Sequence, residues 1–454
     1  MSKLLSLPIR LLRRHDLCYQ VDSSVLRKGR VPPLHHNQPR CAFTATKFNS
    51  IETNDDVEAD VLYEPLEGIE RLENYRSGGY HPIQIGDQFH SRYRVVHKLG
   101  HGSYSTAWLA RDEQFNKYVA LKVCTANSNP KEVDIVSTIL TPPHYSPINK
   151  PGKTMVPSIL DRFTIHGPNG NHACYVTAPA RASLSGLKDG GWTRLFQPGV
   201  ARSLAAQLVL VLDYVHAQGI VHGDVHLGNI LLKVPPDFDR LSLEQFYEKY
   251  GAPERDPVVH LDGKPLPPGV PSHGTTLANP FHPQKNRKYE THTPLASRPP
   301  EARFEPDKPL SFSSDIWSLA CTIWSIIAQR PLFEGFMATE DYMTCEQVDT
   351  LGILPSEWWS RWEARQEKFT ENGKPINRKY FRSWDDRVKD SIEGPRRDRK
   401  IPSFDARERD AIFNLLRQML SFRPEDRPTT KQILESEWMV KWALPEYGKI
   451  ENNV

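Results

Sequence analysis

Hydrophobic and polar positions follow different periods in the two halves of the chain. In the first half, residues 173–179 and three earlier short runs alternate or are largely apolar, which is typical of β-strands; the earlier runs are residues 93–99, 106–110 and 118–123. From residue 204 onwards, apolar side chains recur at helical spacing up to Val215, and residues 315–327 are apolar nearly all round. We therefore expect a β-rich part, followed by a helical part that contains a buried helix.

A polar loop stands between the first of these helices and a further apolar strand. It holds Asp224 and Asn229 five residues apart, and the strand Ile230–Leu232 follows directly. An aspartate in such a loop can accept the proton of an attacking hydroxyl, and an asparagine beyond it can hold a magnesium ion on the phosphates. The spacing therefore suits phosphoryl transfer, although a surface turn before a strand can carry the same short motif.

A glycine-rich turn joins the first two predicted strands. Bare backbone amides in such a turn can approach phosphate closely; the residues are Leu99, Gly100, His101, Gly102, Ser103, Tyr104 and Ser105. Because a strand and not a helix follows, the turn is not a dinucleotide fingerprint. The next strand carries Lys122 among apolar neighbours, and a buried lysine needs a partner. Glu132, on the helix-like run 130–140, is the candidate partner.

The composition excludes several classes of protein. Lys and Arg number 58 against 55 Asp and Glu, so no strongly basic field indicates direct binding to nucleic acid. We expect no membrane span, because no apolar run approaches ~18 residues. The six cysteines contain no C-x-x-C pair, which favours buried thiols in a reducing compartment over a disulfide or zinc framework; they are Cys18, Cys41, Cys124, Cys174, Cys321 and Cys345.

The N-terminal residues differ from the remainder of the chain. Residues 1–45 are basic, interleaved with leucine and isoleucine, and contain no acid before Asp16. This profile is typical of a mitochondrial transit peptide, with Arg40–Thr44 as the candidate processing site. The alternative is a basic leader without an address on a cytoplasmic or nuclear protein. Residues 46–79 are acidic and loop-like, and we interpret them as a linker or a first strap on the fold.

In order and spacing, these motifs resemble those of the protein-kinase family. The resemblance rests on the glycine-rich turn, on Val-Ala-Leu-Lys122, on Glu132, and on the loop from Asp224 to Asn229. It implies an α+β fold of two lobes, a small β-rich N-lobe and a larger helical C-lobe. The implied N-lobe and hinge span residues 80–180, the C-lobe spans 181–446, and a tail spans 447–454.

The same resemblance implies ATP and Mg²⁺ as cofactors and assigns roles to residues. Lys122 would hold the α- and β-phosphates and pair with Glu132. Asp224 would act as the base, and Asn229 would bind Mg²⁺. Contacts with ATP are also implied for residues 99–105 and for Ala107 in the strand that follows them.

A second family has a similar loop. His-Gly-Asp224-Val-His226-Leu-Gly-Asn also looks like the loop of aminoglycoside and choline phosphotransferases, which phosphorylate small molecules. Three later motifs resemble protein kinases instead: Pro-Pro-Glu301, Asp315 at the start of the buried helix, and Arg427, which is expected to pair with Glu301. Together they favour a protein kinase over a small-molecule phosphotransferase.

The resemblance extends to a subfamily. Residues 346–352, followed by Trp358-Trp359, lie at the insert position of the CMGC group, so we place an insert near 340–400. With the His-Gly-Asp loop, this resembles the fungal branch of SR-protein-kinase-like enzymes. It implies a monomeric kinase acting on Ser or Thr of a protein substrate, with basic or Arg/Ser-rich segments as one option. Because Gly223 replaces the usual Arg, we expect no activation by a loop phosphate.

One expected motif is missing. A working kinase needs a second metal ligand, the Asp of Asp-Phe-Gly. Residues 237–239 read Asp-Phe-Asp but follow Asn229 too closely for a returning strand, and Asp262 precedes a glycine without an intervening Phe. Asp262 is therefore only a weak substitute, and residues 272–294 contain no such segment. A deletion and a wrong exon boundary would give the same sequence, so an ATP-dependent Ser/Thr kinase and a catalytically impaired ATP-binding pseudokinase both stay open.

Overall fold

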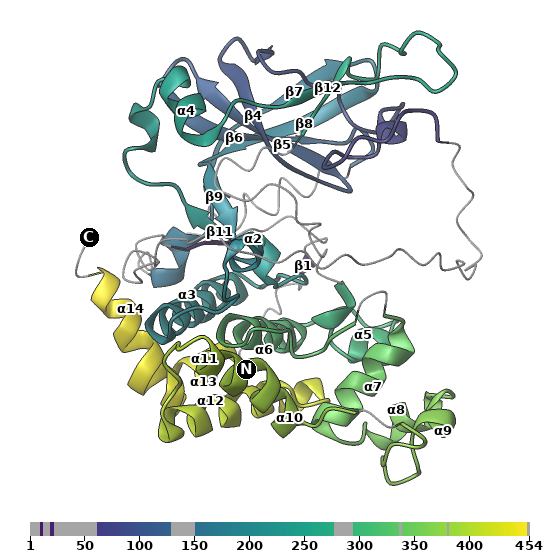
Figure 1. The fold of residues 1–454 in the computed structure, drawn as a ribbon, viewed down its shortest axis with the longest axis vertical. Helices are drawn as coiled ribbons and strands as arrows, with labels where there is room; N and C mark the ends of the chain where they lie inside the picture. The colour runs from purple at the N-terminus through teal and green to yellow at the C-terminus, as the bar shows by residue number, and fades with distance from the viewer. Residues whose placement is uncertain are drawn as a thin grey trace, which may run out of the picture.

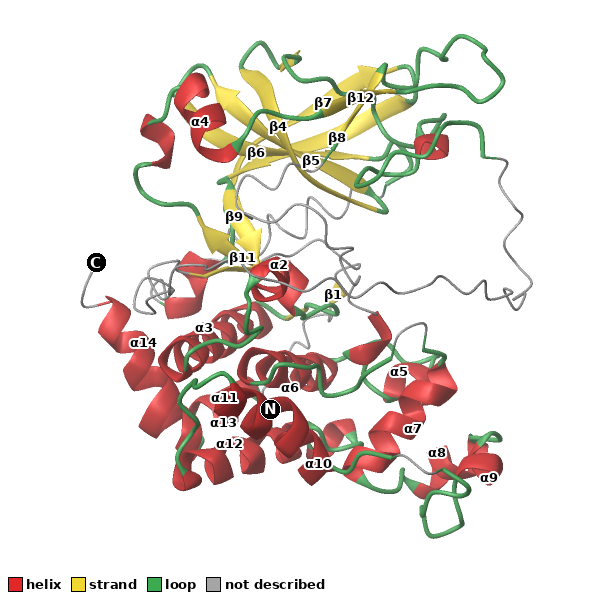
Figure 2. Ribbon diagram, in the orientation of Figure 1, coloured by secondary structure: helices red, strands yellow, loops and turns green. Residues whose placement is uncertain are grey.

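The structure, a computed structural model, consists of two lobes. It describes residues 10–11, 19–21, 61–128, 150–276, 294–335, 338–378 and 381–451. One lobe is a sheet and the other is mainly helical (Figure 1; Figure 2), so the predicted fold is confirmed. The candidate processing site, the run with Glu132, and residues 277–293 lie outside the described residues.

A six-stranded antiparallel sheet forms the N-lobe, in the order β3-β4-β5-β6-β8-β7. The three predicted early strands fall in β4, β5 and β6, and the run 173–179 falls largely in β8. One face of the sheet buries a cluster that includes Tyr93, Trp108 and Leu121. The strands are β3 (Gln88–Phe89), β4 (Tyr93–Gly102), β5 (Ser105–Asp112), β6 (Lys117–Cys124), β7 (Ile159–Gly167) and β8 (Gly170–Thr177).

Residues 61–83 pack against this lobe, including the part that the sequence left as a linker or strap. Their aromatic side chains Tyr63, Tyr75 and Tyr80 form a buried cluster with Val258 and Val270. Inside the lobe, Glu70 accepts a hydrogen bond from Lys98 of β4 at 2.5 Å, and both side chains are 2% exposed. Burial alone raises the pKa of Glu70, but the attraction of Lys98 outweighs it and the pKa ends below its usual value. The segment is thus tied to the sheet by a buried ion pair.

The chain after β11 also returns to the N-lobe. Helix α4 (Leu243–Tyr250) begins with a capping box between Ser242 and Gln245. Its Phe246 is fully buried and packs with Phe238 and with Tyr118 of β6. The strands β12 (Arg255–Pro257) and β13 (His273–Thr275) follow and pair with each other. Although residues 243–275 follow a strand of the C-lobe, α4 and β12 therefore lie with the sheet (Figure 1), and we call this segment the N-lobe insert.

Two long helices form the centre of the C-lobe. They are α3 (Pro198–Ala217) and α6 (Phe312–Ile327), and both are largely buried in one hydrophobic cluster, as predicted for the apolar run of α6. Among the described helices, α3 alone has the length and composition of a membrane span, but 72% of that stretch is buried inside the protein. The remaining helices are α2 (Leu184–Gly190), α5 (Glu301–Phe304), α7 (Glu340–Leu351), α8 (Ser356–Arg361), α9 (Arg365–Lys368), α10 (Trp384–Val388), α11 (Gly394–Asp398), α12 (Ala406–Met419), α13 (Thr430–Leu434) and α14 (Leu444–Glu451).

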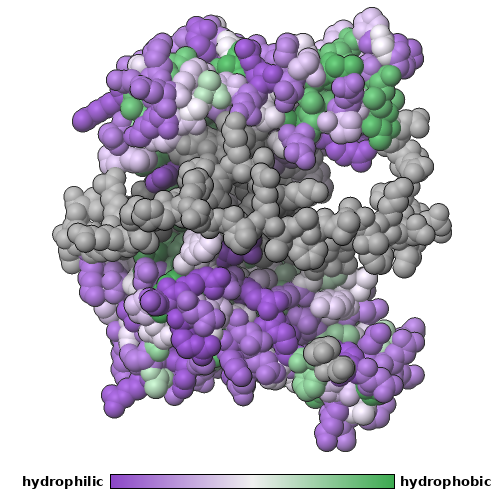
Figure 3. Space-filling view, in the orientation of Figure 1, coloured by the Kyte–Doolittle hydropathy of each residue, from purple (hydrophilic) through white to green (hydrophobic). Residues whose placement is uncertain are grey.

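Short strands lie between the sheet and the helices. β11 (Ile230–Lys233) pairs antiparallel with β9 (Ala180–Ser183) and parallel with β2 (Tyr19–Val21). β10 (Ile220–Val221) pairs parallel with β1 (Arg10–Leu11). Two pieces of the basic leader therefore line the strands on either side of the polar loop. Figure 3 shows that the surface over the helical lobe is mostly hydrophilic.

Candidate active site

The loop that carries Asp224 is fixed at both ends by β10 and β11 and from below by α6. Asp315, which is 1% exposed, accepts hydrogen bonds from the backbone N–H groups of His222 and Gly223, both at 2.7 Å. The imidazole of His216 lies 2.9 Å from the same carboxylate. One buried carboxylate therefore holds two consecutive amides of the loop in place.

The loop turns sharply just before Asp224. Gly223 has a φ of 75°, in the left-handed region that favours glycine. The N–H of Asp224 donates to Nδ1 of the buried His222 ring at 3.1 Å, and the hydroxyl of Thr322 on α6 donates to the carbonyl of Val225 at 3.1 Å. The usual Arg is thus replaced by a residue that suits this backbone conformation.

Asp224 and Asn229 meet across the loop. The amide nitrogen of Asn229 donates to the backbone carbonyl of Asp224 at 2.9 Å and to its carboxylate oxygen Oδ2 at 3.1 Å. Because the nitrogen is used in this way, the amide oxygen is the atom of Asn229 that suits a metal, and Mg²⁺ prefers oxygen ligands. Asn229 and Asp224 thus offer oxygen atoms that a magnesium ion could use, while the described residues contain no cluster of three or more His, Cys, Asp or Glu side chains that could hold a metal.

The glycine-rich hairpin between β4 and β5 lies in the N-lobe sheet. Gly102 pairs with Ser105 across its tip, and the carbonyl of Gly102 accepts a hydrogen bond from the hydroxyl of Tyr80 at 2.7 Å. Ala107 and Lys122 are partners in the β5–β6 ladder. The ammonium of Lys122 lies over the ring of Tyr175 on β8, 5.2 Å from its centroid. The predicted pairing of Lys122 with Glu132 concerns a residue outside the described part of the chain.

Glu301 and Arg427 come together as the sequence predicted. Their side chains form a bidentate ion pair at 2.8 and 2.7 Å, and the guanidinium also donates to the carbonyls of Ser313, Ser421 and Phe422. A pair with this many hydrogen bonds can compensate for the loss of hydration on burial. It joins α5 to the chain that follows α12.

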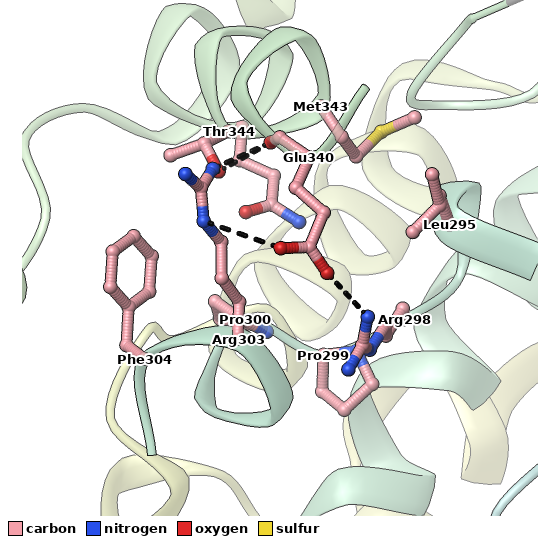
Figure 4. A pocket seen from close by; sticks show the side chains of 10 residues that line it. Leu295, Arg298, Pro299, Pro300, Arg303, Phe304, Glu340, Met343 and Thr344 are labelled. Carbon is pink, nitrogen blue, oxygen red and sulfur yellow. Dashed lines mark hydrogen bonds and ion pairs between the residues drawn. The ribbon is translucent and has the colours of Figure 1, made fainter. Parts of the chain in front are cut away.

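A small pocket opens beside α5 (Figure 4). Arg298 donates to Glu340 at 2.6 Å, and Arg303 donates to Asp341 and to the hydroxyl of Thr344, both at 2.5 Å. These contacts join the chain around Glu301 to α7, the first helix of the predicted insert. The pocket is therefore lined by charges that are largely paired with one another.

The weak metal candidate, Asp262, lies in the N-lobe insert between β12 and β13 and not in the catalytic loop. Asp262 forms an ion pair with Lys264 and lies beside the ring of His260, and its segment pairs with residues 61–64. In the Asp-Phe-Asp run, Phe238 is buried against the N-lobe sheet, and Asp239 accepts a hydrogen bond from the N–H of Tyr118 at 2.9 Å. The structure thus brings Asp224, Asn229 and Asp315 together, and it gives these two acidic runs partners in the N-lobe.

Several residues of the site were not singled out from the sequence. The His-x-Gly spacing of His226 and Gly228 was available as a signal, because it belongs to the loop motif itself. No local pattern indicated that Tyr80 would contact the glycine-rich hairpin, since this contact depends on the path of residues 61–83.

Comparison with known proteins identifies the family. The family model of the protein kinase domain matches residues 93–241 and 277–439, which is more than half of the chain. A serine/threonine protein kinase of Aspergillus fumigatus is 26% identical over 400 residues, covering 82% of this chain and 90% of that protein. Protein kinase dsk1 of Schizosaccharomyces pombe is 38% identical over 171 residues, covering 37% of this chain and 31% of that protein. SRSF protein kinase 3 of Homo sapiens is 37% identical over 186 residues, covering 40% of this chain and 32% of that protein. The chain therefore belongs to the protein kinase family, in its SR-protein-kinase-like branch.

Proposed function

We propose that this protein is an active, ATP-dependent serine/threonine protein kinase. In the proposed reaction, Asp224 accepts the proton of a Ser or Thr hydroxyl. The hydroxyl oxygen bonds to the γ-phosphorus of ATP, the bond to the bridging oxygen breaks, and ADP leaves. Lys122 and the glycine-rich hairpin hold the phosphates. Mg²⁺ on Asn229 would neutralise charge on the transferring group.

The observation that supports this proposal best is the anchoring of the Asp224 loop. Asp315 holds two amides of the loop, and Asn229 holds the carboxylate of Asp224. A general base works best when its geometry is fixed before the substrate arrives.

We propose a protein substrate that contains Ser or Thr in a basic or Arg/Ser-rich segment. The support is similarity: one relative carries SRSF proteins in its name. The Glu301–Arg427 pair and the helix pair α5 and α7 form an ordered surface after the catalytic loop. Such a surface suits an extended polypeptide better than a small molecule.

A transfer assay with matched variants tests the proposal. Wild-type protein, Asp224→Asn and Asp262→Asn are incubated with γ-labelled ATP, Mg²⁺ and a basic protein. We expect Asp224→Asn to lower incorporation at least ~10²-fold, whereas Asp262→Asn leaves it near the wild-type level. Equal labelling by wild type and Asp224→Asn contradicts the proposal. Lys122→Met should also remove nucleotide binding without unfolding the protein.

A second candidate function is an ATP-binding member of the family without turnover. It is favoured by the missing Asp-Phe-Gly segment, since the weak substitute Asp262 contacts His260 and Lys264 away from the catalytic loop. This candidate predicts that ATP raises the melting temperature equally with and without Mg²⁺. Mg²⁺-dependent turnover excludes it.

A further inference from the structure

The geometry points to His226 as a positioning residue for the carboxylate of Asp224; this inference rests on the proposed function. His226 lies within the loop, two residues after Asp224. Its ring nitrogen Nε2 is 3.5 Å from Oδ2 of Asp224, and the two side chains are 16% and 13% exposed. This is the same oxygen that Asn229 contacts at 3.1 Å. Two groups from the same loop therefore converge on one oxygen atom.

The tautomer of His226 follows from its second nitrogen. Nδ1 accepts the backbone N–H of Gly228 at 3.0 Å, so it carries no proton in the neutral ring. The proton of a neutral imidazole must then be on Nε2, which faces Asp224. The backbone of the loop thus turns the ring into a donor toward the catalytic carboxylate.

Gly228 provides the space that the ring occupies. A Cβ atom at position 228 would lie 2.6 Å from Cε1 and 2.8 Å from Nδ1 of His226, closer than atoms without a bond between them can approach. Any side chain at this position would displace the imidazole. His226 and Gly228 therefore form one unit, and the loop needs both residues to keep the ring against Asp224.

The consequence for the reaction is the orientation of Asp224. Asn229 donates to Oδ2, and Nε2 of His226 faces the same oxygen from 3.5 Å, so both groups act on the rotation of the carboxylate. The contact from His226 is long for a hydrogen bond, and contacts of this kind often tighten when substrate binds.

A merely structural role must be separated from this positioning role, because His226 also caps the short turn Leu227–Asn229. Two substitutions separate them. In His226→Asn, the side-chain oxygen can still accept the N–H of Gly228, so the cap is kept and the donor toward Asp224 is lost. In His226→Gln, the amide nitrogen can take the place of Nε2.

The kinetic test uses these variants with Gly228→Ala in the transfer assay. We expect His226→Asn to melt near the wild-type temperature, to keep its KM for ATP, and to lose kcat on the order of 10²-fold, as for a misplaced catalytic group. His226→Gln should recover most of that loss, and Gly228→Ala should resemble His226→Asn. Equal kcat in wild type and His226→Asn, or equal losses in the Asn and Gln variants, would overturn the inference.

A second measurement does not depend on turnover. In protein labelled with ¹⁵N-histidine, the resonances of His226 are assigned by their absence in His226→Asn. We expect the Nε2–H tautomer and a changed Nε2 shift in Asp224→Asn. An Nδ1–H tautomer, or an Nε2 shift unaffected by Asp224→Asn, contradicts the inference. If wild type shows no turnover but the Nε2–H tautomer is present, the proposed kinase activity fails and the positioning contact stands.

Discussion

Each lobe contains a buried ion pair, but the two pairs differ in whether both residues lie within the part of the chain matched by the family model. Glu301 and Arg427 of the C-lobe both lie within the residues matched by the family model. In the N-lobe, Lys98 lies within the match, whereas Glu70 precedes its start at residue 93. Helix α4, which packs on the same lobe, falls in the gap between the two matched ranges. The C-lobe pair is therefore made by residues within the family match, whereas the N-lobe uses two segments from outside it.

This difference indicates where the chain departs from its family. The catalytic loop is held by Asp315, which lies in the matched part of the chain. The glycine-rich hairpin, in contrast, receives the hydroxyl of Tyr80 from outside the match. We expect changes in the added segments to alter the stability of the N-lobe more than the chemistry at Asp224.

The largest effect is expected for the C-lobe pair. Arg427→Met leaves the carboxylate of Glu301 buried without its partner, which should lower the free energy of unfolding by about 3–5 kcal/mol. Urea denaturation followed by tryptophan fluorescence measures it, since the guanidinium lies 5.1 Å from the ring centroid of Trp317. The exposed pair Arg423–Glu357 is the control, and Arg423→Met should cost less than about 1 kcal/mol. Similar losses in both variants would contradict this account.

The next effect tests whether the N-lobe insert, which contains α4, contributes to the stability of the N-lobe. Phe246→Ala removes a fully buried ring from the cluster with Tyr118 and Phe238 and should cost about 3 kcal/mol. Hydrogen exchange should show the loss in β4, β5 and β6 and not in α6. Glu248→Ala, on the exposed side of α4, is the matched control. If hydrogen-exchange protection of the sheet is unchanged in Phe246→Ala, the N-lobe insert covers the lobe without stabilising it.

A smaller, pH-dependent effect is expected in the N-lobe. Burial lowers the pKa of His81 to about 4, with a further contribution from His172, and burial also lowers the pKa values of His97 and His172. In the unfolded chain these groups titrate near 6.5, so between pH 6.5 and about 4 the unfolded state binds more protons. The contribution of these neutral imidazoles to the stability of the lobe is thus fully present above pH 6.5 and is lost as the pH decreases from 6.5 to about 4.

Denaturation midpoints at about pH 7.5 and about pH 5 measure this loss. His81→Phe should reduce the difference between the two midpoints, because it removes one of the buried imidazoles. His166→Gln, at an exposed position, should leave the difference unchanged. A His81→Phe protein with the full acid sensitivity of the wild type would show that these buried rings are not its cause.

The smallest effect concerns the leader. Gln20 is the partner of Leu231 in the parallel β2–β11 ladder, and Gln20→Pro removes a backbone N–H from β2. We expect a loss of about 1 kcal/mol, the contribution of a single hydrogen bond. Deletion of residues 1–25 should cost more, because it uncovers both β10 and β11. Deletion without any change in stability would show that the leader does not belong to the folded domain.

Local sequence predicted the elements whose burial is visible in the spacing of their apolar residues. The alternation of residues 93–99 gave β4, and the all-round apolar pattern of residues 315–327 gave the buried helix α6. Cys124, Cys174, Cys321 and Cys345 are buried and form no disulfide, as expected, whereas Cys18 and Cys41 lie outside the described residues. The contact of Asp224 with Asn229 follows from motif spacing, because a tight loop between two short strands allows few arrangements. The contact of Asp315 with the loop joins residues far apart in sequence and was not predicted.

The added segments were harder to predict, because their partners are distant in sequence. The capping box from Ser242 to Gln245 could have indicated α4, but nothing in that stretch states which surface Phe246 covers. Likewise, Glu70 gave no local sign of its partner Lys98. Burial of such residues is decided by tertiary packing and not by local pattern.

The most direct test of the account is the Mg²⁺ dependence of phosphate transfer at the Asp224 loop. Incorporation from ATP into a basic protein is measured with and without Mg²⁺, for wild type and for Asp224→Asn. We predict incorporation only by the wild type and only with Mg²⁺. Incorporation by Asp224→Asn at the wild-type rate, or none by the wild type under conditions in which it binds ATP, would contradict the account.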